Sequence, residues 1–241
     1  MSGVFVATAL VIDGAYFLRR YRWSFPTADP TDAVRVAEAV RWLAFWHVAH
    51  RLSHDVRSAW MEGVGTAPGE GPELYRVFFY DCPPLTKKMH RPVSKQAVDL
   101  SRTPEARLRF AIHDELSKIR KVALRLGRLN DASEWRLTAT ATRRLAQGLP
   151  VELTDEDFEI DTKQKGVDMK LGLDVASMAF KRQVDQIVLV AGDADFVPAT
   201  KLARREGIDV VLDSMGGTPA ADLLQHVDGV RHCRRQKEEQ R

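Results

Sequence analysis

The chain has 241 residues, of which 44% are hydrophobic and 29% charged, and its formal net charge is +3. This length fits one large α/β domain, and the composition is ordinary for a soluble globular protein. The small positive charge permits a nucleic-acid partner but does not require one. Cys82 and Cys233 match no CxxC or zinc-ligand spacing, which excludes a cysteine-based zinc site and favours a reducing cytosol.

The sequence contains no recognisable signal peptide or membrane-spanning segment. No apolar run reaches membrane-spanning length, and no basic region precedes the first apolar run. We therefore expect a cytoplasmic protein without a signal peptide and without a membrane partner.

Strands and helices alternate in the first part of the chain. Residues 4–12 form an apolar run that predicts a buried strand, and residues 14–20 predict the beginning of a helix. Apolar side chains recur every three or four positions in residues 34–54, which predicts a second helix. Residues 63–72 predict an exposed loop, and residues 74–80 predict the second strand.

The middle of the chain has weaker patterns. A helix is predicted over residues 103–122, short strands over 123–126 and 135–140, and a helix over 141–147. No flexible linker flanks residues 85–161, so we interpret them as an elaboration of a single domain that spans residues 1–241.

From residue 167 onward the alternation is regular. The predicted elements are a helix at 167–182, a strand at 186–191, a helix at 198–205, a strand at 208–212, a short helix at 218–225 and an edge strand at 229–233. This order predicts an α/β fold with a mainly parallel sheet and right-handed crossovers.

Aspartates follow two of the predicted strands directly. Asp13 ends the first strand, and Asp193 and Asp195 follow the strand that ends at residue 191. Ligands of open α/β sheets bind beyond the carboxyl ends of the strands, so we expect these carboxylates to converge. Converging carboxylates repel each other unless a proton or a cation lies among them, and an oxygen-only set suits Mg²⁺ or Mn²⁺.

Each acidic residue also has a structural interpretation. Asp13 is equally suited to cap a helix, and Asp195 is expected to cap the helix after it, which leaves Asp193 without a structural role. Asp168 falls in the first turn of a predicted helix, where a negative charge favours the helix dipole. Asp81 ends the second strand, where it either flanks the cleft or forms a turn.

Three segments resemble the NYN domain, a branch of the PIN-like nuclease superfamily that includes the LabA-like proteins. They are residues 12–14 (IDG), 164–168 (QKGVD) and 191–196 (AGDADF), in the family's order and spacing. The resemblance implies a Rossmann-like three-layer α/β/α sandwich and a metal-dependent ribonuclease. It also implies that Asp13, Asp168, Asp193 and Asp195 form the acidic site.

The expected activity is hydrolysis of single-stranded RNA with one or two Mg²⁺ or Mn²⁺ ions at the four aspartates. Lys165, Arg204 and Arg205 are candidates to hold the RNA backbone, although a solvated surface position is the commoner role for such residues. Tyr16 stands where the family often has Asn, and it either stacks on a base or covers apolar surface.

Two other functions compete with the ribonuclease interpretation. A non-catalytic RNA-binding module of the same fold is the alternative, with Tyr16 as its mark. A phosphatase is disfavoured, because it needs a DxD pattern after the first strand and Asp13 is followed by Gly14 and Ala15. The sequence is compatible with a homo-oligomer and does not determine the oligomeric state.

Overall fold

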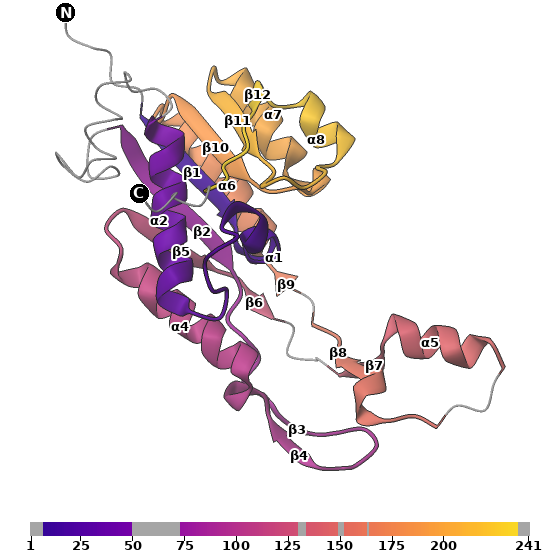
Figure 1. Ribbon diagram of the computed structural model, residues 1–241. Coiled ribbons are helices and arrows are strands. Elements are labelled where there is room, and N and C mark those ends of the chain that lie inside the picture. Colours follow the sequence, from indigo (N-terminus) through magenta and orange to yellow (C-terminus); the bar gives the residue numbers. More distant parts are fainter. Residues whose placement is uncertain (1–6, 50–72, 130–133, 149–151, 163, 236–241) are drawn as a thin grey trace, which may run out of the picture.

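The computed structural model describes residues 7–49, 73–129, 134–148, 152–162 and 164–235. Its body is a six-stranded parallel sheet with helices on both faces, as the sequence predicts (Figure 1). The predicted loop at 63–72, the end of the helix after residue 49 and the start of the first strand before residue 7 lie outside the described residues. Among the helices that the structure describes, none combines the length and apolar character needed to cross a bilayer.

The strands of the body follow the order β12-β11-β10-β1-β2-β5. They are β1 (Thr8–Asp13), β2 (Leu74–Asp81), β5 (Val122–Leu126), β10 (Gln186–Val190), β11 (Asp209–Asp213) and β12 (Gly229–Val230). The helices are α1 (Gly14–Ser24), α2 (Ala33–Ala49), α4 (Pro104–Lys118), α6 (Val167–Phe180), α7 (Val197–Arg205) and α8 (Ala221–Gln225). These bounds lie within a few residues of the predicted ones.

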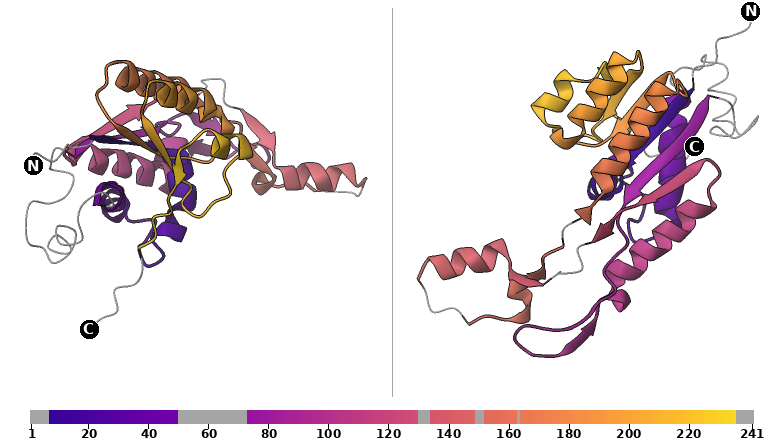
Figure 2. Two further views of the ribbon diagram at one scale, coloured as in Figure 1. Left: turned by 90° about the horizontal axis from the view of Figure 1, so that it is seen from above. Right: turned by 180° about the vertical axis from the view of Figure 1, so that it is seen from behind.

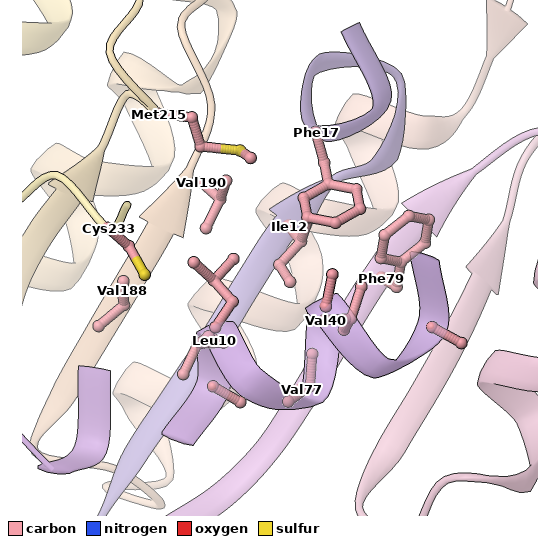
Figure 3. Close-up of a cluster of buried hydrophobic side chains, with 14 of the residues drawn as sticks. Leu10, Ile12, Phe17, Val40, Val77, Phe79, Val188, Val190, Met215 and Cys233 are labelled. Carbon is pink, nitrogen blue, oxygen red and sulfur yellow. The ribbon is translucent and has the colours of Figure 1, made fainter. Parts of the chain in front are cut away.

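Strand β1 is the centre of the molecule. Its side chains alternate between two cores, because successive residues of a strand point to opposite faces of the sheet. Leu10 and Ile12 pack with the helices α1, α2 and α4, beside Val188 and Val190 of β10 (Figure 3). On the other face, the alternate residues of β1 pack with α6, α7 and α8. Burial on both faces explains why β1 reads as a continuous apolar run.

The strand order reverses at β1. The chain places β2 and β5 on one side of β1, and then returns to place β10, β11 and β12 on the other side. Such a reversal opens a crevice at the carboxyl ends of the two strands that flank it, here β1 and β10. The topology therefore predicts the site at the ends of these two strands.

An arm projects from the body beyond the ends of β2 and β5 (Figures 1 and 2). We define the arm as the described residues 83–102, 127–129, 134–148, 152–162 and 164–165. Its elements are β3 (Lys88–His90), β4 (Ala97–Asp99), η1 (Leu100–Arg102), β6 (Arg128–Leu129), β7 (Trp135–Leu137), α5 (Ala139–Ala146), η2 (Asp155–Asp157), β8 (Phe158–Ile160) and β9 (Gln164–Lys165). Within the expected elaboration at 85–161, α4 and β5 therefore complete the body, and the other helices and strands that the structure describes there belong to the arm.

A buried ion pair joins β2 to α4. The carboxylate of Asp81 is fully buried, and Nη1 of Arg109 donates to its two oxygens at 2.7 and 2.6 Å. Nε2 of His113 lies 2.8 Å from Oδ2 of Asp81. Burial alone would raise the pKa of Asp81, but the hydrogen bond with His113 and the charge of Arg109 hold this pKa below its ordinary value.

We expect Asp81→Asn to lower the free energy of unfolding by about 3 kcal/mol at neutral pH, because it leaves a partly buried guanidinium without its counter-charge. A carboxylate with a lowered pKa stabilises the fold above its unfolded pKa, so the difference from the wild type should shrink below about pH 4. Chemical denaturation across pH measures both effects. Asp114→Asn on the exposed face of α4 is the control, and an equal loss in both variants would contradict a special role for Asp81.

Candidate functional site

Asp13 ends β1 and caps α1 at the same time. Its Oδ1 accepts a hydrogen bond from the backbone N–H of Tyr16 at 3.2 Å. The chain turns directly from strand to helix because Gly14 has no side chain, and a Cβ there would lie 2.7 Å from the backbone oxygen of Tyr80. Both interpretations of Asp13 are thus compatible, since the cap fixes a carboxylate at the edge where a ligand is expected.

Asp193 and Asp195 follow the neighbouring strand. Ile12 pairs with Val190 in the sheet, so the loop after β10 begins beside the end of β1. Asp193 caps the short helix η3 (Ala194–Phe196), and its Oδ1 accepts from the backbone N–H of Asp195 at 3.4 Å. The expected roles were wrong in this respect, because Asp193 is the cap and Asp195 is the residue capped. Both side chains are exposed.

Asp168 approaches from the first turn of α6. Glycine at position 166, with φ of +80°, turns the chain from β9 into this helix. Partial loss of hydration raises the pKa of Asp168, and the charges of Asp195 and Asp193 raise it further. Partial burial also raises the pKa of Asp13, and Asp168 adds to the rise while the hydrogen bond from Tyr16 opposes it. The charge of Asp168 thus acts on Asp13, and the charges of Asp193 and Asp195 act on Asp168.

The chemistry of this cluster suits a cation. The four side chains offer only oxygen, and their charges repel each other, which a divalent ion would relieve. Within the described ranges, no three acidic, imidazole or thiol groups already stand at metal-binding separation. Asp168, Asp193 and Asp195 are exposed, so a change of side-chain rotamer is open to them on ion binding.

Tyr16 is built into the scaffold of the site. Only 7% of its surface is exposed, and its hydroxyl donates to the backbone oxygen of Ser214 at 2.6 Å. Its ring packs so closely against Gly192 that a Cβ there would lie 2.4 Å away, and the guanidinium of Arg19 lies 5.5 Å from the ring centre. The packing interpretation is thus favoured over stacking on a base. The contact between Tyr16 and Gly192 was not predicted from the sequence. The one feature of the sequence that could have indicated it is the glycine directly before Asp193.

The remaining predicted residues are dispersed. Lys165 is exposed on β9, three residues before Asp168. Asp81 is engaged in the buried ion pair with α4, so its carboxylate is not available to a substrate. Arg204 pairs with Asp228 at 2.8 Å, and together with Arg205 it ends α7 where the chain enters β11. Because β11 is parallel to β1, these two arginines lie at the edge opposite to the four aspartates, which removes them from the site.

Comparison with known proteins identifies the family of the chain. The family model described as "NYN domain" matches residues 108–230, which include Asp168, Asp193 and Asp195. An uncharacterized protein of Methanocaldococcus jannaschii is 28% identical over 121 residues, or 50% of this chain and 48% of that protein, so the chain spans about half the length of this relative. No solved structure gives a significant match. Since the family model covers just over half of the chain and the fold agrees, the chain belongs to the NYN domain family.

Proposed function

We propose that this protein is a metal-dependent ribonuclease whose site consists of Asp13, Asp168, Asp193 and Asp195. The NYN domain belongs to the PIN-like nucleases, which makes phosphodiester chemistry the natural function of its acidic edge. The observation that carries the proposal is that Asp13 and the loop of Asp193 and Asp195 directly follow β1 and β10, which pair side by side in the sheet. The strand order reverses between β1 and β10, and the crevice at the carboxyl ends of such strands is where sheets of this kind bind ligands, which supports the proposal.

The four aspartates have different roles in this proposal, because Asp13 is held in place more firmly than the other three. Asp13 is half-buried and held by its cap, so it would offer a fixed ligand, whereas Asp168, Asp193 and Asp195 are exposed and would contribute through a change of rotamer. A Mg²⁺ or Mn²⁺ ion held by these carboxylates would lower the pKa of a bound water and would stabilise charge on the leaving oxygen. Lys165, which lies on β9, neutralises part of the charge of the RNA phosphate. Single-stranded RNA is the proposed substrate.

The alternative is an RNA-binding module without catalytic activity. The feature of the sequence that favours this alternative is Tyr16, which replaces the Asn common in the family. In this chain, however, Tyr16 packs under the loop that carries Asp193 and donates its hydroxyl to Ser214. Such integration supports an adapted site rather than a decayed one, because all four acidic residues accompany it.

We expect Asp193→Asn to abolish Mn²⁺-dependent RNA cleavage while the fold is retained. Asn caps a helix as well as Asp does, so the loop should keep its shape and lose only the charge. Even outer partners of metal ligands cost roughly 10- to 100-fold, and we therefore expect a loss of at least about 100-fold. Cleavage of a panel of single-stranded RNAs measures it. Glu206→Gln, which removes an exposed carboxylate at the opposite edge, is the matched control.

Undiminished cleavage by purified Asp193→Asn would remove this residue from the catalytic site. A comparable loss in Glu206→Gln would show that the effect reflects net charge and not the position of Asp193.

A second prediction concerns Tyr16 as a positioning residue. Tyr16→Ala should lower the free energy of unfolding by about 3–5 kcal/mol, because it empties a packed aromatic position. Tyr16→Phe should cost only about 1 kcal/mol, since the oxygen of Ser214 still accepts from the backbone N–H of Gly217. In the Ala variant we expect cleavage to fall far more than RNA affinity, because the loop of Asp193 loses its support.

Chemical denaturation, together with RNA binding and cleavage at one salt concentration, separates this role from stacking on a base. If Tyr16→Ala lost RNA affinity at unchanged stability, Tyr16 would be a stacking residue and its packing role would be wrong.

A further inference from the structure

A two-stranded stem connects the arm to the acidic edge. Strand β6 follows β5 after a glycine at position 127, and β9 leads through the turn at position 166 into α6. The two strands pair antiparallel, with Arg128 opposite Lys165 and Leu129 opposite Gln164. Strand β9 of the stem is therefore the last strand before Asp168 in the sequence.

Two cations face each other on this stem. Directly opposed residues of an antiparallel pair have their Cβ atoms about 4.5–5.5 Å apart on the same face, where like charges destabilise the pairing. Arg128 and Lys165 are both exposed. Within the part of the chain that the structure describes, neither forms an ion pair with a carboxylate. This arrangement is unfavourable unless an anion lies between the two side chains.

Three acidic residues of the arm are engaged in ion pairs with other arginines. Arg136 lies 3.0 Å from Glu159 and 3.0 Å from Asp161 across the β7–β8 pair. Arg144 of α5 lies 2.7 Å from Asp157. Arg136 and Arg144 are thus neutralised within the arm, whereas Arg128 and Lys165 form no ion pair among the described residues.

The stem is fixed relative to the acidic site. A Cβ at Gly127 would lie 2.8 Å from the backbone oxygen of Lys165 and 2.6 Å from the side chain of Val167. Three residues of chain span at most about 10 Å, so Lys165 is anchored within that distance of Asp168. A close, rigid placement of this kind suits the binding of adjacent groups of one ligand.

We propose that Arg128 and Lys165 together bind a backbone phosphate of the RNA next to the phosphate at the four aspartates. The planar guanidinium of Arg128 offers paired donors to phosphate oxygens, and the ammonium of Lys165 adds a second charge. Contacts of this type fix the position of the strand and carry no base specificity. The inference adds Arg128 to the site, and it rests on the proposed function for the identity of its ligand.

The test measures RNA binding without turnover. The probe is a fluorescein-labelled oligouridylate of about 12 nucleotides, within the size range of single-strand binding sites, in the presence of EDTA. The full chain is compared with Arg128→Gln, Lys165→Gln, the double variant and Arg128→Lys over a range of salt concentrations. Arg205→Gln is the matched control, because it removes one exposed arginine at the opposite edge.

Neutralising the stem pair should weaken binding and flatten its salt dependence. For single strands, the slope of log K against log salt falls by about 0.7 for each phosphate contact removed. We expect that decrease in the double variant, a smaller effect in Arg128→Lys, and no change in Arg205→Gln. Thermal unfolding verifies that each variant is folded.

Other results would overturn the inference. These are an unchanged slope in the double variant, an equal decrease in Arg205→Gln, or no binding of the probe by the wild type. Cleavage is measured separately with Mn²⁺. If the wild type cleaves no RNA while the stem variants still flatten the slope, the proposed function fails and the phosphate site stands.

Discussion

Four carboxylates lie at one edge of a parallel sheet and repel each other, and the local structure of that edge holds them there. Asp13 is fixed by the turn from β1 into α1, and its neighbours arrive on β10 and α6. Burial and mutual repulsion raise the pKa of Asp13 and Asp168, so the fold accepts an electrostatic cost at this edge. A divalent cation is the ligand that would convert the cost into a favourable interaction.

Tyr16 links the two strands that bring the acids together. Its backbone N–H is held by Asp13 of β1, its ring supports Gly192 after β10, and its hydroxyl reaches Ser214 after β11. One residue thus contacts the carboxyl ends of three parallel strands, through its backbone and its side chain. The departure from the family pattern at this position thereby becomes part of how this chain builds its site.

Much of the fold could be predicted because buried parallel strands leave a plain signal. The apolar runs of β1 and β10 gave the central strands, and the aspartates directly after them gave the acidic edge. The strand predicted at 135–140 contains β7, but β6 and β9 of the arm escaped prediction, since they contain two residues each and pair across at least 34 intervening positions. Their pairing depends on tertiary contacts that no local pattern encodes.

The errors at the site have equally specific causes. Asp193 and Asp195 are two residues apart, so sequence alone does not decide which of them accepts the backbone hydrogen bond. The partner of Asp81 is Arg109 on another element, which left the turn interpretation and the cleft interpretation open. Arg204 was misplaced because α7 carries the chain back across the sheet to the far edge.

The central claim is that the four aspartates share one metal site. A crystal of the full chain grown with Mn²⁺ tests it most directly, because anomalous scattering locates the ion independently of the protein model. The account predicts an anomalous peak at the carboxyl ends of β1 and β10, coordinated by oxygens of Asp13, Asp193 or Asp195, with Asp168 within the same shell or bound through water. A well-ordered site without a peak at saturating Mn²⁺, or a peak confined to another part of the molecule, would contradict it.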